Sequence, residues 1–100
     1  MRNVEVHPAV YVEMENARAW YESQRVNLGN DFLAEVDRAI ESIRESPDLW
    51  PVYYGESGVR RMLLHRFPFS IIYRAKGTVI QVVAVMHLRR RPGYWKKRIE

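Results

Sequence analysis

The chain has 100 residues, of which 47% are hydrophobic and 28% charged, with a formal net charge of +4. This is the composition of a globular protein, so the sequence predicts one domain over residues 1–100 and excludes an extensively disordered chain. The absence of cysteine excludes disulfides and cysteine-based metal or nucleophile chemistry. No apolar run reaches the roughly 18 residues of a membrane span, and the start lacks the apolar run of a signal peptide. We therefore expect a cytoplasmic protein without membrane contact.

Charge is divided unevenly along the chain. Residues 1–58 carry five Arg or Lys and eleven Asp or Glu, whereas residues 59–100 carry eleven Arg or Lys and one Glu. Such segregation produces a directional field and indicates an anionic partner. The alternative is that the two halves neutralise each other within the fold.

The first elements are a strand and a helix. Val4 and Val6 alternate with polar residues, which predicts a short strand over residues 3–6. Pro8 suits the first turn of a helix. Apolar residues then recur at steps of three, four or seven, which marks one helical stripe: Val10, Met14, Ala17, Tyr21 and Leu28.

A second helix follows after a break over residues 27–30. Its stripe contains Phe32, Leu33, Val36, Ala39, Ile40 and Ile43. Charged residues are expected to face away from that stripe: Glu35, Asp37, Arg38, Glu41 and Arg44. Acidic residues in general are expected on solvated helix faces. The short break predicts an antiparallel helical hairpin, and Ser46-Pro47 ends it.

The second half of the chain predicts three strands. Residues 48–58 form an expected loop in which Trp50 plugs the base of the core. Strands are expected over residues 59–67, 69–75 and 79–87, and their short connections require an antiparallel meander. The last strand is almost wholly apolar, as a central strand should be. The fold class is therefore α+β, in the order β-α-α-β-β-β, with a helical hairpin packed on a twisted, mainly antiparallel sheet.

Basic residues cluster on this framework and after it. Thirteen of the sixteen cations are Arg, whose planar guanidinium suits phosphate. Tyr94 is as well suited to stack on bases as to anchor the tail, whereas Trp95 is favoured as a core anchor. The tail arginines are expected to be solvated. The candidate residues for binding a target or nucleic acid are Arg60, Arg61, Arg66, Arg74, Arg89, Arg90, Arg91, Tyr94, Lys97 and Arg98.

Several chemistries find no support in the sequence. The three histidines lack metal-ligand spacing, and no glycine-rich phosphate loop or nucleophile elbow occurs, so no metal or cofactor is expected. His87 is the best candidate for moving a proton, since an ordinary imidazole titrates near 6.5. With Tyr94 and an arginine-rich site it could form a metal-free ribonuclease. The alternative is that His87 caps the end of its strand by hydrogen bonding.

Two runs of sequence are similar to a known superfamily. They are "VRRMLLHRFPFSIIYR" and "VVAVMHLRRRPGYWKKR", and the earlier run "FLAEVDRAIESIRESPDLWP" fits as well. Together they resemble the RelE/ParE superfamily of bacterial type II toxin–antitoxin toxins, and more its ParE-like, plasmid-stabilisation branch. The resemblance covers nearly the whole chain. It implies a growth-inhibiting toxin that a cognate antitoxin neutralises by wrapping it with a C-terminal segment.

The superfamily divides by activity. RelE-like members are ribosome-dependent mRNA endonucleases, whereas ParE-like members poison DNA gyrase and lack the nuclease site. By resemblance, Arg61 and Tyr94 match basic and tyrosine positions of the nucleases. Leu63, Ser70 and Leu88 stand where further basic residues would be expected.

The resemblance therefore favours a ParE-like inhibitor, with DNA gyrase as the leading target. The first alternative is a metal-free ribonuclease acting on mRNA at the ribosome, which requires Arg61, His87 and Tyr94 to converge. The second is a non-toxic basic nucleic-acid-binding module.

Overall fold

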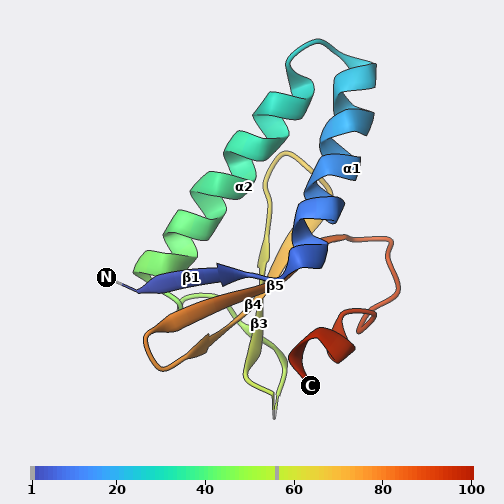
Figure 1. Cartoon of the computed structure of the whole chain (residues 1–100). Coiled ribbons are helices and arrows are strands. Elements are labelled where there is room, and N and C mark those ends of the chain that lie inside the picture. Colours follow the sequence, from blue (N-terminus) through green and yellow to red (C-terminus); the bar gives the residue numbers. More distant parts are fainter. Residues whose placement is uncertain (1, 56) are drawn as a thin grey trace.

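The structure is a computed structural model that describes residues 2–55 and 57–100. Two helices lie side by side over one face of a single sheet, and the C-terminal segment curls back beside it (Figure 1). In chain order the elements are β1 (Asn3–Val6), α1 (Pro8–Gln24), α2 (Leu28–Glu45), β2 (Val52–Tyr54), β3 (Val59–Leu63), β4 (Phe69–Lys76), β5 (Val79–His87) and a 3-10 helix, η1 (Lys96–Ile99). Neither helix of the described residues is long and apolar enough to cross a membrane.

The sheet has the strand order β1-β5-β4-β3-β2. The pairing of β1 with β5 is parallel, and all other neighbours are antiparallel. The predicted α+β class, with a helical hairpin on a mainly antiparallel sheet, is confirmed. The apolar strand predicted over residues 79–87 is β5, which lies between β1 and β4 and is covered on both faces.

One strand was not predicted. Residues 52–54, in the expected loop, form β2, whose Val52 pairs with Arg60 of β3. The loop prediction is wrong at this point because three residues between Pro51 and Gly55 are too few to show a pattern. Glu56, in the same loop, lies outside the described residues.

β3 is shorter than predicted and ends at Leu63 instead of Phe67. The backbone N–H of Leu64 donates to the carbonyl of Phe69 at 2.9 Å, which closes a turn before β4. A side chain from α2 supports this turn. Glu35 accepts hydrogen bonds from the backbone N–H groups of His65 and Arg66, at 2.8 and 3.1 Å. The turn therefore depends on a residue far away in the sequence.

The helical hairpin turns more tightly than the sequence indicated. Asn27 takes up a left-handed conformation (φ 71°), and Leu28 begins α2 instead of ending the stripe of α1. Gly29 lies where the helices are closest. A Cβ atom there would be 2.6 Å from the carbonyl oxygen of Arg18, so only glycine allows this approach.

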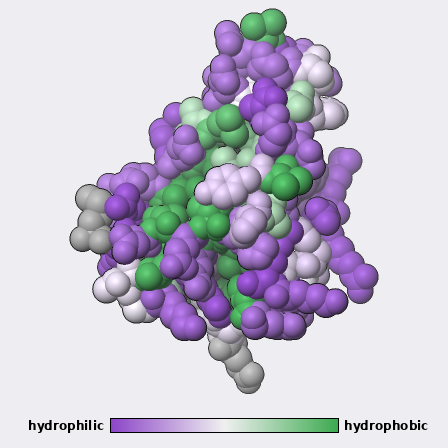
Figure 2. Space-filling view, in the orientation of Figure 1, coloured by the Kyte–Doolittle hydropathy of each residue, from purple (hydrophilic) through white to green (hydrophobic). Residues whose placement is uncertain are grey.

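The sheet separates two cores. The larger lies under the helices and includes Val10, Phe32, Val36, Ile43, Phe69, Ile71, Tyr73, Ile80, Val82 and Val85, with Trp50 packed at its side. The smaller covers the opposite face and consists of Val59, Ile72, Val83, Ala84, Met86 and Trp95. On the outside, apolar side chains gather down the middle of the face seen in Figure 2, between hydrophilic borders.

Trp95 is completely buried in the second core, so its predicted role as an anchor is confirmed. The ring of Tyr54 packs against it edge-to-face, with the ring centroids 5.2 Å apart. The face of the sheet opposite the helices is thus partly covered by the returning C-terminal segment, because an exposed indole would leave a large apolar area in water.

Candidate interaction surface

β5 leads directly into a basic turn. The backbone N–H of Arg90 donates to the carbonyl of His87 at 2.9 Å, and Nδ1 of His87 accepts a hydrogen bond from the backbone N–H of Arg89 at 3.0 Å. His87 therefore caps the end of its strand, which is the alternative that the sequence left open. The turn holds Arg89, Arg90 and Arg91 in exposed positions.

The chain after this turn is anchored by Arg98 as well as by Trp95. Nη1 of Arg98 donates to the carbonyl of Val83 at 3.0 Å and to Oε1 of Glu13 at 3.1 Å, and its Nη2 donates to Oε2 of Glu13 at 3.2 Å. The two side chains are only 17% and 11% exposed. The expectation that Arg98 is solvated is therefore wrong, whereas its binding of a target stays a prediction.

Glu13 joins three parts of the fold. Its carboxylate also accepts hydrogen bonds from the hydroxyl of Tyr94 and, at 3.1 Å, from the backbone N–H of Val85. This N–H group is available because β1 ends at Val6, paired with Val82, so the next part of β5 pairs with β4 on one side and has no strand beside it on the other among the described residues. Beyond the end of β1, the carboxylate thus takes the place of a strand as the hydrogen-bond acceptor for this edge of β5.

Two acidic residues contradict the expectation of solvated helix faces. Glu35 is buried against the turn after β3, and the side chain of Glu13 on α1 is nearly buried. The signal was present in their spacing. Glu13 lies three residues after Val10 and four before Ala17, both buried, so it belongs to the inward face of α1.

The hydroxyl of Tyr94 is not free for proton transfer. Burial, and then its hydrogen bond to Glu13, raise the pKa of Tyr94 well above its usual value of 10.0. The guanidinium of Arg90 lies over the same ring, 3.9 Å from its centroid. Tyr94 therefore anchors the tail and supports a cation, whereas its stacking on bases stays a prediction.

The three residues of the ribonuclease hypothesis are not brought together. Arg61 lies on the face of the sheet that carries Val59, where its guanidinium is 4.3 Å from the ring centroid of Tyr53. His87 packs on the helix side, with its ring 5.0 Å from that of Phe69. His87 and Tyr94 line one hollow, and Arg61 does not.

Other predicted binding residues have partners within the fold. Nη1 of Arg60 donates to the carbonyl of Trp50 at 2.6 Å, and Nε of Arg74 donates to Gln81 at 2.6 Å. Arg66 lies 3.5 Å from the carboxylate of Asp31. These arginines hold loops and strand ends in place, so fewer of their guanidinium donors remain free to bind a partner.

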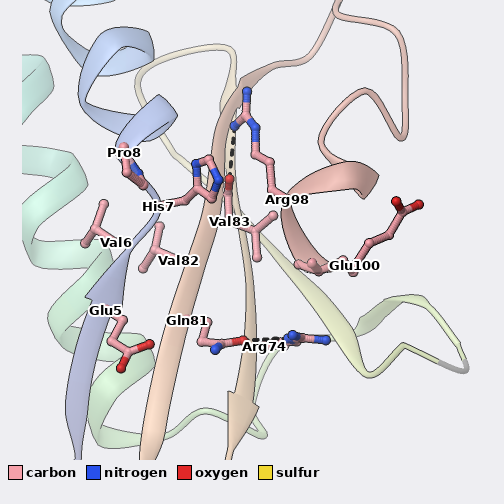
Figure 3. A pocket seen from close by; sticks show the side chains of 11 residues that line it. Glu5, Val6, His7, Pro8, Arg74, Gln81, Val82, Val83, Arg98 and Glu100 are labelled. Carbon is pink, nitrogen blue, oxygen red and sulfur yellow. Dashed lines mark hydrogen bonds between the residues drawn. The ribbon is translucent and has the colours of Figure 1, made fainter.

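A hollow of about 400 Å³ lies beside Arg74, at the edge where β1 meets β5 (Figure 3). Figure 3 shows Arg74 reaching Gln81 and Arg98 reaching the carbonyl of Val83. Glu5 and Glu100 line the same hollow. Since carboxylates and guanidinium groups are mixed there, it does not form a site for an anion. Among the described residues, no group of His, Asp and Glu is arranged to hold a metal ion.

Five exposed cations follow β5 within ten residues of one another. Arg89 to Arg91 lie on the turn after β5, and two lysines lie at the start of η1. Nζ of Lys96 is 4.5 Å from the ring centroid of Tyr54. We call these five residues the basic tail surface: Arg89, Arg90, Arg91, Lys96 and Lys97.

Comparison with known proteins agrees with this architecture. The family model of the ParE toxin of the type II toxin–antitoxin system parDE matches residues 4–92. A solved structure described as the chromosomal ParDE TA system from P. aeruginosa is similar to the chain, with a TM-score of 0.62 and 20% identity. The match covers 87% of this chain and 96% of that one. No curated protein matches the sequence.

Proposed function

The chain belongs to the ParE toxin family of type II toxin–antitoxin systems, and on that premise we propose that it inhibits bacterial growth by binding DNA gyrase through the basic tail surface. Membership of this family implies a cognate antitoxin that neutralises it. The proposed target implies action in the cytoplasm. Inhibition by binding requires a stable surface but no catalytic group. The anchored C-terminal segment offers such a surface.

The observation that carries the proposal is the anchoring of that segment. Trp95 is fully buried, and Arg98 is tied to α1 and β5, so the cations between and beside them are held outward. A preorganised charged surface loses little conformational entropy on binding and attracts an oppositely charged partner at long range. Both properties favour a tight inhibitor of an enzyme that itself handles DNA.

The second candidate is the metal-free ribonuclease acting at the ribosome. It draws support from one hollow that His87, Arg90 and Tyr94 line together. Three contacts weaken it. Nδ1 of His87 accepts a backbone hydrogen bond, the hydroxyl of Tyr94 is engaged by Glu13, and Arg61 lies across the sheet. A general acid or base needs a free atom within reach of the substrate.

The experiment is a supercoiling assay with purified gyrase and the full-length protein. We expect inhibition by the wild type, and about tenfold weaker inhibition by Arg89→Gln/Arg91→Gln, because rim charges chiefly govern association. The matched control Arg38→Gln/Lys76→Gln removes the same charge from exposed positions outside the basic tail surface. It should inhibit as the wild type does.

Two outcomes would contradict the proposal. Undiminished supercoiling at saturating protein, together with transcript cleavage at ribosome-bound codons in primer extension, would favour the ribonuclease. Normal growth of cells that overproduce the protein without any antitoxin would contradict both toxic activities. It would favour the basic nucleic-acid-binding module instead.

A further inference from the structure

The face of the sheet opposite the helices is covered over only part of its length. Trp95 packs over the second core, which includes Val59 and Val83. Beyond that core, at the end of the sheet where β3 and β5 end and β4 begins, two leucines remain exposed to water. Leu63 is 49% exposed and Leu88 is 46% exposed. Neither the anchoring of the C-terminal segment nor the basic tail surface uses these two side chains.

The two leucines flank one position of β4. Leu63 is directly opposite Ser70, and Ser70 is directly opposite Met86 of β5. Opposite residues of antiparallel strands point to the same side of a sheet, so all three lie on the face of the second core, to which Met86 belongs. The backbone N–H of Leu88 donates to the carbonyl of Pro68 at 2.9 Å, so the pairing of β4 with β5 continues beyond His87. Leu88, two residues after Met86, therefore points to this same face.

Ser70 indicates that this end of the face is apolar. Its side chain is completely buried, and its hydroxyl has no hydrogen-bond partner among the described residues. A hydroxyl buried in this way lies among apolar groups, since a polar group within reach would bond to it. The exposed leucines are thus the margin of a continuous apolar area and not two isolated side chains. We call these three residues the leucine patch: Leu63, Ser70 and Leu88.

Arginines border the leucine patch on both of its outer strands. Arg61 lies two residues before Leu63 and points to the same face, where its guanidinium lies over the ring of Tyr53. Arg89 directly follows Leu88 and is exposed. An apolar centre with a charged rim is the usual composition of a protein–protein interface. The positive sign of this rim suits carboxylates on the partner.

We propose that the leucine patch is the apolar anchor of the target-binding surface, and that it takes an apolar side chain flanked by carboxylates from the gyrase protein. This rests on the proposed function and deepens it, because it assigns the contact to the protein and not to the DNA that gyrase carries. Leu88 directly precedes Arg89 of the basic tail surface, so one partner can cover both. A DNA strand fits the patch less well, because leucine offers its phosphates neither charge nor a hydrogen bond.

The test measures binding of the full chain to purified gyrase without DNA, by titration calorimetry at several temperatures. Leu63→Ala/Leu88→Ala should weaken binding about 30-fold, the effect of losing the centre of an interface. The heat-capacity change of binding should become less negative, because less apolar surface is buried. The matched control is Val12→Ala/Val26→Ala, which truncates two exposed apolar residues of the helical hairpin. It should change affinity less than about threefold.

Salt distinguishes the leucine patch from the basic tail surface. Added salt should weaken the wild type and the leucine variant by the same factor, because the two proteins carry the same charges. Arg89→Gln/Arg91→Gln should instead reduce the dependence of binding on salt. Leu63 and Leu88 are about half exposed, so circular dichroism should show that the leucine variant folds.

The outcomes separate this inference from the proposed function. Inhibition of supercoiling by the wild type and the leucine variant at the same concentrations would overturn the anchor and leave the proposed function standing. Binding of the wild type to gyrase only in the presence of DNA would also overturn the anchor, and would assign the surface to the DNA. Failure of the wild type to inhibit supercoiling would overturn the proposed function, and the anchor with it.

Discussion

Arg98 of η1 donates to both carboxylate oxygens of Glu13 of α1, and the same guanidinium reaches the carbonyl of Val83 at the bulge of β5. This one pair ties the C-terminal segment to a helix and to a strand edge. The pair is nearly buried, so removing one partner would leave the other charge with neither a counterion nor full hydration.

The first prediction concerns this pair. Arg98→Ala should lower the free energy of unfolding by about 3 kcal/mol, because it leaves the Glu13 carboxylate buried without its cation. Arg89→Ala, which removes an exposed arginine of the same tail, should change it by less than about 0.5 kcal/mol. Urea denaturation measures both, and trypsin should cut near Lys96 and Lys97 faster in Arg98→Ala.

The double variant Glu13→Gln/Arg98→Met sharpens this test. Since it removes both charges together, it should be more stable than Arg98→Ala alone. If all three variants unfolded at the same urea concentration as the wild type, the pair would not anchor the tail.

The second prediction concerns the helix crossing. Gly29→Ala should destabilise the protein by about 1–3 kcal/mol, because its Cβ would be 2.6 Å from the carbonyl oxygen of Arg18 and the helices would have to separate. Gly55→Ala is the matched control, since no atom lies within 4 Å of a Cβ built there. Thermal unfolding should distinguish them, and equal melting temperatures would contradict the close approach.

The third prediction concerns alkaline pH. Tyr73 is fully buried and donates its hydroxyl to the carbonyl of Pro47 at 2.6 Å, and burial raises its pKa from 10.0 to about 12. Folding therefore favours the protonated phenol. Its contribution to stability should be complete below pH 10 and should be lost as the pH rises from 10 to about 12.

Tyr73→Phe is the variant that isolates this effect. It should lower stability by about 1–3 kcal/mol at neutral pH, because the carbonyl of Pro47 loses its donor. Above pH 10, its stability should fall less steeply than that of the wild type. Parallel pH profiles of the two proteins in urea denaturation would show that Tyr73 does not titrate with unfolding.

Much of this fold follows from local pattern. Alternation predicted the strand over residues 3–6, periodicity predicted both helices, and apolar content predicted that β5 is an interior strand covered on both faces. The family resemblance is confirmed by the family match. The end of β3 could not be predicted in the same way, because Glu35 supports the following turn from another element.

The candidate site was less predictable than the fold. The sequence indicated that the tail is basic and that Trp95 anchors it. No pattern in the sequence distinguished one tail arginine from another. Arg98 differs from Arg89 only through contacts with Glu13 and Val83, which are remote in sequence. The inward spacing of Glu13 was a readable signal, since it lies between Val10 and Ala17 on one helix face.

The parallel pairing of β1 with β5 has a consequence for synthesis. On the ribosome, β1 and both helices are made first, yet among the described strands β1 pairs with β5 alone, with Asn3 opposite Val79. A chain interrupted before β5 lacks the strand that joins β1 to β4, and it lacks the indole that covers the far face. Because such distant pairings form late, fragments of an unfinished chain should be harmless to the cell that makes them.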